Sequence, residues 1–457
     1  MKSFKIKEIA RAVKGELVQG NPDKIINNIS TDTRTMNQGD LFVALIGENF
    51  DGHNFIEDAA KNAAGGIITD RIVDIKDKIP LILVEDTTTA LQDIAKYYRS
   101  INKDIKIIGI TGSAGKTTTK DIVAEVLRQK FTVLKTEENL NNYIGVPLTI
   151  LSLTGKEDFG VIEMGMNQKG EIKLLSEIAS PQIGIVTNVG PAHLAYFGSV
   201  KEIAQEKREL ITSLPKEGKA ILNYDNKYTK NMKNYFKGDA LTYFGLSPEA
   251  DIYAENINND DENNSIYFTV NYADEKYTLR LSKPGIHNVY NVLPAIIIAK
   301  EYGMKWEQIQ KGLDKVKLSS LRMKFINKNS ITYINDSYNA NPLSMKAAID
   351  VLNHTGEKRK IAVLGDMLEL GKNKEDEHIK IGEYVFEKKI DYLITTGKLG
   401  KKIADGAVNA GMPSRNVYHT DNKKEAGRKL QKIQNKKDTI LIKGSRSMKM
   451  EEILEII

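Results

Sequence analysis

The residue types best suited to chemistry in this sequence lie in one short stretch, residues 107–120. An apolar run typical of a buried parallel strand leads into Gly112 and Gly115, which are followed by Lys116 and Thr117. The glycines allow a tight turn that directs backbone N–H groups inward, and a following helix would add its positive end. Lys116 can then reach the β- and γ-phosphates of a nucleotide, and the Thr117 hydroxyl can hold Mg²⁺. The general motif has four residues between its glycines and this loop has two, so the prediction rests on the strand–loop–helix order.

Three further polar side chains stand out in the stretch that follows. Glu163 ends the apolar run Phe159–Ile162, at the edge of a parallel sheet where ligands bind, so it could hold Mg²⁺ or order a water. His193 comes shortly after another predicted strand, and an active-site role and a loop histidine both remain open. Lys207 lies among charged neighbours in the predicted helix Val200–Leu214, and this pattern favours a solvated surface lysine.

Length and composition narrow the class of protein. A chain of 457 residues is longer than a domain with a single hydrophobic core usually is, so we expect about two to four domains. The net charge of +6 is small for this length and gives no reason to expect nucleic acid as a partner. There are no cysteines, which excludes disulfides and thiolate zinc sites. We find no signal-peptide pattern and no membrane-length apolar run, so we expect a soluble cytoplasmic protein without membrane insertion. We also expect a monomer.

The order of predicted elements indicates an α/β protein of three domains. Residues 1–103 predict a small α/β unit, and a polar link leads to a central unit at 104–315 with a mainly parallel sheet. Residues 316–457 predict a Rossmann-like unit without a G-x-G-x-x-G motif, so no dinucleotide is implied. The main predicted helices are Ile6–Val13, Phe55–Ala64, Thr88–Ser100, Asp121–Lys130, Val200–Leu214 and Val292–Tyr302. The main predicted strands are Asp40–Leu45, Gly66–Thr69, Leu81–Val84, Thr132–Leu134, Phe159–Glu163, Ile183–Asn188, Ile331–Asn335, Ile361–Gly365, Tyr392–Thr395 and Thr439–Lys443.

Taken together, these motifs resemble those of the bacterial Mur ligases over essentially the whole chain. The family's shortened phosphate loop, Thr-Gly-x-x-Gly-Lys-Thr, corresponds to 111–117 and accounts for the unusual glycine spacing. Its other motifs correspond to Asn139–Pro147, Glu163–Gly165, Asn188–His193 and Gly285–Asn291. Three further elements, Asp336–Pro342, Leu364–Gly371 and Lys443–Arg446, resemble the member that adds D-alanyl-D-alanine. The Asp-Asn-Pro-Arg motif of the preceding ligase is absent.

The resemblance implies an ATP- and Mg²⁺-dependent reaction of peptidoglycan precursor synthesis. ATP would phosphorylate the terminal carboxylate of UDP-N-acetylmuramoyl-tripeptide, and the amine of D-Ala-D-Ala would attack the acyl phosphate and release phosphate. The first domain would bind the UDP-sugar, the central domain ATP, and the third domain the D-Ala-D-Ala acceptor. A lysine, Mg²⁺ and oriented N–H groups suit phosphoryl transfer, which depends on positioning and charge neutralisation.

The resemblance also assigns roles to individual residues. The phosphate cradle would be Gly112, Ser113, Ala114, Gly115, Lys116, Thr117 and Thr118. Thr117 and Glu163 would hold the first Mg²⁺, His193 would contact a second, and Lys207 falls where relatives carry a carbamylated lysine that serves as an anionic metal ligand. Lys116, Glu163, His193 and Lys207 form the expected catalytic set. The remaining ATP contacts would be His287, Asn288, Asn291, Arg322 and Asp336. The substrate contacts would be Ser30, Asp32, Arg34, Asp51, His53, Asn139, Asn142, Tyr338, Asn339, Asn341, Lys443, Ser445 and Arg446.

Two alternatives stay open on the sequence alone. One is another amide ligase of the same architecture, such as a folylpolyglutamate synthase or the ligase of the preceding step. The other is a P-loop nucleotide switch or binding module without an amine acceptor. The third residue of the tripeptide stays open between lysine and diaminopimelate.

Overall fold

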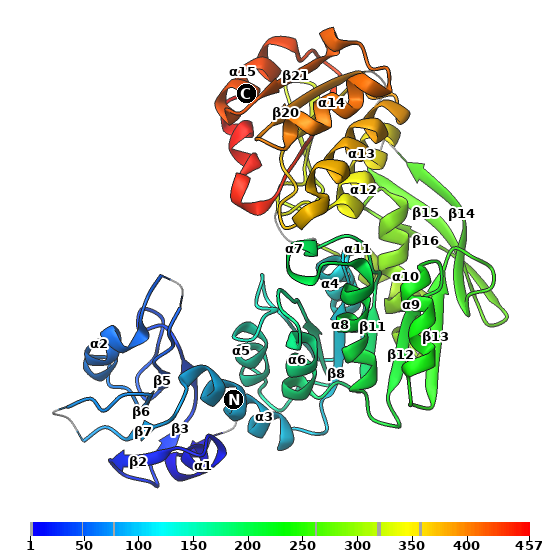
Figure 1. Ribbon diagram of the computed structural model, residues 1–457. Coiled ribbons are helices and arrows are strands. Elements are labelled where there is room, and N and C mark those ends of the chain that lie inside the picture. The colour runs from blue at the N-terminus through cyan, green and yellow to red at the C-terminus, as the bar shows by residue number, and fades with distance from the viewer. Residues whose placement is uncertain (1–2, 48, 76–77, 261–262, 318–320, 356–358) are drawn as a thin grey trace.

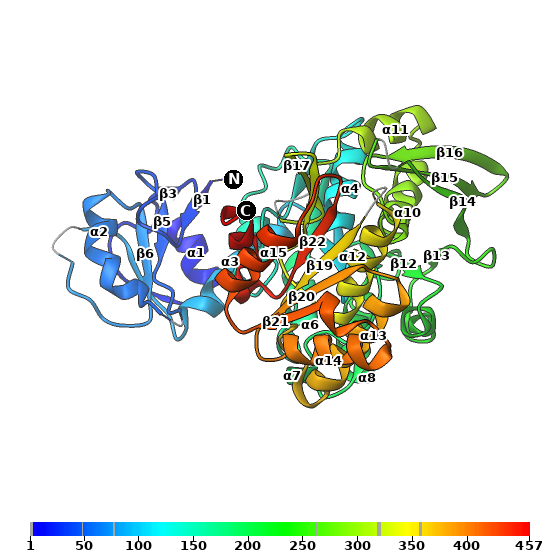
Figure 2. The same cartoon turned by 90° about the horizontal axis from the view of Figure 1, so that it is seen from above.

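The computed structural model of the chain forms three α/β domains, which confirms the predicted fold class (Figure 1). It describes residues 3–47, 49–75, 78–260, 263–317, 321–355 and 359–457. The N-terminal domain lies to one side of the central domain, and the C-terminal domain lies above the central one (Figures 1 and 2). Among the described residues, no helix is both long and apolar enough to cross a membrane.

The N-terminal domain is built on a mixed sheet in the order β2-β7-β6-β5-β4, with a separate β1–β3 pair. Its strands are β1 (Phe4–Lys5), β2 (Glu16–Gln19), β3 (Ile25–Ile26), β4 (Ile29–Ser30), β5 (Leu41–Val43), β6 (Gly66–Thr69) and β7 (Leu81–Leu83). Its helices are α1 (Ile6–Ala12), α2 (Ile56–Lys61) and α3 (Thr87–Ser100), with a short 3₁₀ turn at Gly52–Phe55. The strands from β4 to β7 pair in parallel, and Phe42 and Ile67 are buried between the sheet and α2.

Helix α3 joins the first domain to the second. Its buried face contacts the central helices α5 and α6, and the Arg99 guanidinium donates to the Ala179 carbonyl at 2.9 Å. Gln92 of the same helix donates to the Tyr143 carbonyl at 3.2 Å. The apolar face of α3 therefore fixes the first domain against the second.

The central domain contains a long sheet in the order β16-β15-β14-β13-β12-β11-β8-β10-β9. The strands are β8 (Lys106–Thr111), β9 (Val133–Lys135), β10 (Phe159–Glu163), β11 (Ile183–Val186), β12 (Lys219–Asn223), β13 (Ala240–Gly245), β14 (Ile252–Asp260), β15 (Ser265–Tyr272) and β16 (Glu275–Leu281). The helices are α4 (Lys116–Leu127), α5 (Gly145–Leu151), α6 (Glu171–Ala179), α7 (Leu194–Phe197), α8 (Val200–Thr212), α9 (Lys227–Lys230), α10 (Ile286–Glu301) and α11 (Trp306–Asp314). Strands β8 to β14 pair in parallel, and β8 lies between β11 and β10, so the loop after β8 opens where these neighbouring strands also end.

The C-terminal domain has the sheet order β17-β18-β22-β19-β20-β21, parallel except for β17. The strands are β17 (Lys324–Lys328), β18 (Ile331–Asn335), β19 (Lys360–Leu364), β20 (Tyr392–Thr396), β21 (Val417–Thr420) and β22 (Thr439–Lys443). The helices are α12 (Pro342–His354), α13 (Lys374–Glu387), α14 (Gly400–Ala410) and α15 (Lys423–Ile433). Because β18, β22 and β19 are adjacent and parallel, the polar residues that follow them meet at one edge of the sheet.

Candidate nucleotide and substrate site

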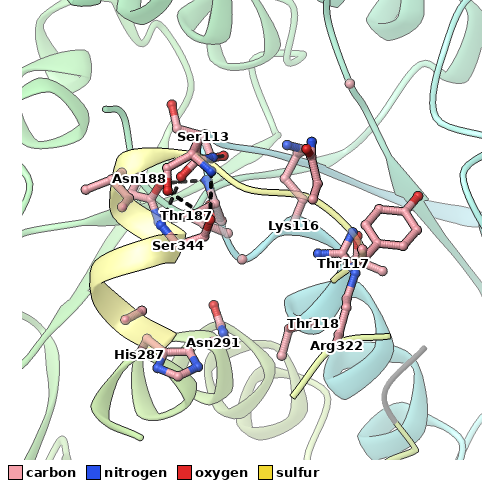
Figure 3. A pocket seen from close by; sticks show the side chains of 18 of the residues that line it. Ser113, Lys116, Thr117, Thr118, Thr187, Asn188, His287, Asn291, Arg322 and Ser344 are labelled. Atoms are coloured by element: carbon pink, nitrogen blue, oxygen red, sulfur yellow. Dashed lines mark hydrogen bonds between the residues drawn. The ribbon is translucent and has the colours of Figure 1, made fainter. Parts of the chain in front are cut away.

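A cavity of about 570 Å³ lies where the carboxyl ends of the central strands meet the C-terminal domain. Figure 3 shows the phosphate loop and α4, α10 and α12 around it, with Lys116, His287, Asn291 and Ser344 labelled. Its wall includes many of the predicted site residues: Ser113, Ala114, Gly115, Lys116, Thr117, Thr118, Asn139, Asn142, Glu163, His193, His287, Asn288, Asn291, Arg322, Asp336, Tyr338, Asn339, Asn341 and Lys443. The fold thus brings together polar residues separated by more than three hundred positions in the chain.

Helix α4 begins at Lys116, earlier than the predicted start at Asp121. The N–H groups of its first turn, at Lys116, Thr117 and Thr118, have no preceding helical carbonyl to accept their hydrogen bonds. They are therefore suited to bind an anion. Gly115 caps the helix with φ +83°, a left-handed conformation that glycine adopts without strain. The Lys116 ammonium donates to the Gly112 carbonyl at 2.8 Å, and burial lowers its pKa.

The first half of the phosphate loop is tied to the end of β11. The Ser113 N–H donates to the Asn188 carbonyl at 3.0 Å, and the Ala114 N–H donates to the Asn188 Oδ1 at 2.9 Å. The Thr187 hydroxyl donates to the Ala114 carbonyl at 2.6 Å. The N–H groups of Ser113 and Ala114 are therefore engaged within the protein, and the N–H groups at the start of α4 remain for phosphate.

Glu163 and Thr117 fit the predicted Mg²⁺ site. Glu163 is 2% exposed, and its Oε1 accepts hydrogen bonds from the Thr117 hydroxyl at 3.1 Å and the Asn141 amide at 2.9 Å. Its other carboxylate oxygen, Oε2, is buried without a hydrogen-bond partner. A buried carboxylate oxygen without a donor is costly, and a cation would satisfy it. In the described part of the chain, no group of three or more His, Cys, Asp or Glu side chains is arranged to hold a metal ion. The predicted site differs in kind, because one of its ligands is the Thr117 hydroxyl.

The prediction that Lys207 is a solvated surface lysine is wrong. Lys207 is 1% exposed, because it shares the buried face of α8 with Ile203 and Leu210. Its ammonium lies 3.6 Å from the Met166 sulfur, and burial holds its pKa well below the ordinary value of a lysine. The neighbouring charges suggested a surface, whereas the apolar residues four positions before and three after it indicated burial.

His193 lines the cavity and contacts the C-terminal domain. Its Nδ1 lies 2.7 Å from a carboxylate oxygen of Glu369, and the Ala195 N–H donates to the Glu369 carbonyl at 2.9 Å. The contact with His193 lowers the pKa of the Glu369 carboxyl. In this structure the histidine therefore joins two domains at the edge of the cavity.

The first turns of α10 form another wall of the cavity. The helix begins at Ile286 rather than at the predicted Val292, so His287, Asn288 and Asn291 lie on it. Burial lowers the pKa of His287 to about 4, which leaves the imidazole neutral at physiological pH. The Thr119 hydroxyl donates to Asn291 Oδ1 at 3.3 Å, which fixes α10 against α4.

Loops from the C-terminal domain close the cavity opposite the phosphate loop. The buried Lys443 ammonium contacts Asp336 Oδ2 at 2.5 Å and donates to the Asn339 carbonyl at 2.9 Å. The Arg322 guanidinium lies over the Tyr338 ring, 4.0 Å from its centroid. Lys443 thus holds the loop that carries Asp336 and Asn339 in place.

Asn341 connects that loop with the phosphate loop. Its Oδ1 accepts from the Ser344 N–H at 2.9 Å and caps α12, while its Nδ2 donates to the Ser113 carbonyl at 3.1 Å. A single amide therefore fixes the start of a C-terminal helix and contacts the nucleotide loop of the central domain.

Other predicted residues lie outside the wall of this cavity: Ser30, Asp32, Arg34, Asp51, His53, Gly112, Lys207, Ser445 and Arg446. The Arg34 guanidinium donates to the Asp32 carboxylate, and this contact lowers the pKa of Asp32 to about 2. The His53 ring lies between Asp51 at 2.6 Å and Asp70 at 3.0 Å, with both nitrogens occupied. The Ser445 hydroxyl accepts from the Leu368 N–H at 2.8 Å.

The cavity wall also contains residues that the motifs did not single out as ligands: Asn141, Thr187, Asn188, Asn223, Asn226 and Tyr290. Most are amides or hydroxyls on loops after strands, and such residues are common in ordinary turns. Thr187 and Asn188 directly follow β11, and Asn223 and Asn226 lie at the end of β12 and shortly after it. This position at strand ends is the signal that could have identified them.

Fold and site define a multidomain P-loop protein whose nucleotide cavity is closed by a second α/β domain. The chain belongs to the Mur ligase family. The family's "Mur ligase middle domain" matches residues 110–299, its "Mur ligase, glutamate ligase domain" residues 321–446, and its "Mur ligase family, catalytic domain" residues 25–99.

Curated relatives and solved structures agree with this assignment. The chain is 38% identical to the UDP-N-acetylmuramoyl-tripeptide–D-alanyl-D-alanine ligase of Bacillus subtilis, over 98% of this chain and 97% of the relative. It is 35% identical to the ligase of that name from Escherichia coli, over 100% and 99% of the two chains. MurF from Acinetobacter baumannii superimposes with a TM-score of 0.91 at 31% identity, over 100% of this chain and 98% of that one. MurF from Thermotoga maritima in complex with ADP gives 0.84 at 28% identity, over 94% and 96%.

Proposed function

We propose that this protein is the ATP-dependent ligase that joins D-alanyl-D-alanine to UDP-N-acetylmuramoyl-tripeptide in peptidoglycan precursor synthesis. The observation that carries the proposal is the shared cavity, in which the start of α4 and the strand-end loops of the C-terminal domain face one space. The relatives bearing this enzyme name match the chain over nearly its full length.

The geometry suits activation of a carboxylate, which is a poor electrophile. Lys116 and the first-turn N–H groups of α4 are placed to bind and neutralise the phosphates, so that a carboxylate oxygen can attack the γ-phosphoryl group. The resulting acyl phosphate is attacked by the amine of D-Ala-D-Ala, and phosphate leaves. Closure by the C-terminal domain would keep water from the acyl phosphate.

Magnesium would be held by Thr117 and Glu163, with His193 placed for a second ion. When bound, it neutralises charge on the transferring phosphoryl group. We also propose that Lys207 is carbamylated. Its amine is buried beside a thioether, burial lowers its pKa, and the described structure shows no carboxylate bonded to it.

The proposal assigns the UDP-sugar to residues 1–103, ATP to 104–315 and the D-Ala-D-Ala acceptor to 316–457. Asn139 and Asn142 line the cavity on the loop whose Tyr143 carbonyl accepts from Gln92 of α3, and they would contact the muramoyl substrate. The proposal takes the enzyme to be a monomer, in which one chain supplies every residue named. It would act in the cytoplasm, where ATP and nucleotide-linked sugars are made.

Oxygen-isotope transfer tests this proposal. If the terminal carboxylate of the UDP-tripeptide carries ¹⁸O, an acyl phosphate delivers one labelled oxygen to the released phosphate. We expect labelled phosphate in step with the ligated product, measured by mass spectrometry. Unlabelled phosphate alongside ligated product would rule out the acyl phosphate, and the absence of ligated product would rule out the ligase.

A further inference from the structure

Asn141 lies at the junction of the phosphate loop, strand β10 and the loop before α5. Its side-chain amide donates to Glu163 Oε1 at 2.9 Å, and its backbone carbonyl accepts from the Gly165 N–H at 2.8 Å. The residue is thus bonded to both sides of Met164, at the carboxyl end of β10. Both contacts lie within the central domain and do not depend on how the domains are placed.

The Glu163 carboxylate is held in one orientation by this environment. The Thr117 hydroxyl supplies a second bond to Oε1, at 3.1 Å. The Glu163 N–H donates to the Thr136 hydroxyl at 3.0 Å, and the buried Lys120 ammonium donates to the Thr136 carbonyl at 2.7 Å. Both donors that reach the carboxylate thus occupy Oε1, and Oε2 stays buried without a partner.

We propose that Asn141 is a positioning residue that reserves Glu163 Oε2 for the cation bound with the nucleotide. Two hydrogen bonds to Oε1 keep the Glu163 carboxylate from rotating. The carboxylate therefore presents Oε2 to the cation. Outer hydrogen bonds of this kind orient metal ligands and tune their affinity. The inference rests on the magnesium role proposed above for Glu163.

The same loop links this carboxylate to the first domain. Gln92 of α3 donates to the Tyr143 carbonyl, two residues beyond Asn141. The orientation of the metal ligand is therefore set by the loop proposed to contact the muramoyl substrate.

The test measures ADP affinity by calorimetry, with Mg²⁺ and with a chelator. In the native protein Mg²⁺ should strengthen ADP binding. In Asn141→Ala and in Asn141→Leu, which keeps the side-chain volume, that gain should fall by about tenfold or more, while affinity in chelator stays unchanged. Asn141→Gln, which can still donate, should recover part of the gain. Leu140→Ala is the matched control, because Leu140 is an exposed neighbour on the same loop and lies outside the cavity wall, and it should keep the full gain.

Each result has a distinct meaning. A full Mg²⁺-dependent gain in both Asn141→Ala and Asn141→Leu would overturn the inference. An equal loss of affinity in chelator would also overturn it, because the substitution would then disturb the phosphate loop itself. No Mg²⁺ dependence in the native protein would overturn the magnesium role and this inference with it, whereas ligation itself is tested separately by the isotope experiment.

Discussion

At the scale of single residues, burial decides what the charged groups of the site can do. Lys207 and Lys443 are buried and Lys116 lines the cavity, and their partners differ: a carbonyl for Lys116, a thioether for Lys207 and a carboxylate for Lys443. The Lys443 ammonium contacts the Asp336 carboxylate and donates to the Asn339 carbonyl. Burial lowers the pKa of Lys207 well below its ordinary value. A lower pKa raises the share of unprotonated amine, and the unprotonated amine is the form that reacts with carbon dioxide.

Carbamylation of Lys207 gives a prediction at this scale. Protein equilibrated with ¹³C-bicarbonate should show a carbamate resonance in the ¹³C spectrum that is missing in Lys207→Ala. Lys201→Ala, on the exposed side of the same helix, should keep the signal. Ligase activity should fall at least a hundredfold in Lys207→Ala, since a metal ligand would be lost. A spectrum without a carbamate signal in the active native protein would contradict the assignment.

At the scale of elements, glycine-capped helix starts shape the site. Gly115 and Gly170 cap α4 and α6 with nearly equal φ values, +83° and +87°. A Cβ at Gly115 would lie 2.4 Å from Asn291 Oδ1, whereas a Cβ at Gly170 would meet no atom within 4 Å. The two positions therefore share the same backbone requirement and differ in the space around them.

This pair allows a matched comparison. Gly170→Ala should lower the free energy of unfolding by about 1 kcal/mol, from left-handed strain alone, and leave ADP affinity unchanged. Gly115→Ala should add a clash with α10 and weaken ADP binding by at least tenfold, because the N–H groups of α4 would be displaced. Calorimetry of ADP binding and thermal unfolding of both variants measure these effects. Equal ADP affinity in the two variants would contradict the packing described for α4 and α10.

The sequence predicted many of the buried apolar strands, although it missed the buried strand β12. Gly66–Thr69, Ile331–Asn335 and Thr439–Lys443 match β6, β18 and β22 to the residue. The half-exposed β13 and the edge strands β17 and β21 carry no clear apolar pattern and were not predicted. In the same way the cavity residues Asn141 and Asn188 were not assigned, because their partners are fixed by the order of strands in the sheet.

At the scale of the whole molecule, the central and C-terminal domains meet at the nucleotide loop. Asn341 donates to the Ser113 carbonyl, and Glu369 contacts His193 and Ala195. Because these contacts border the cavity, we expect nucleotide and substrate to favour this arrangement of the two domains. An open form would lack them.

Asn341→Asp tests this coupling. Aspartate keeps the oxygen that caps α12, but it loses the donor to Ser113 and faces its carbonyl with a charge. Small-angle scattering should show that an ATP analogue with UDP-sugar substrate compacts the native protein, and that Asn341→Asp compacts less at similar thermal stability. Native-like compaction in the variant, or none in the native protein, would contradict the proposed closure.

The central claim is that one cavity joins ATP, a UDP-linked tripeptide carboxylate and a D-Ala-D-Ala amine. The most direct measurement is phosphate release with all three substrates present and with each omitted in turn. We predict that release requires all three, and that Lys116→Ala abolishes it because the phosphates lose their neutralising charge. Phosphate release that does not depend on D-Ala-D-Ala would contradict the claim.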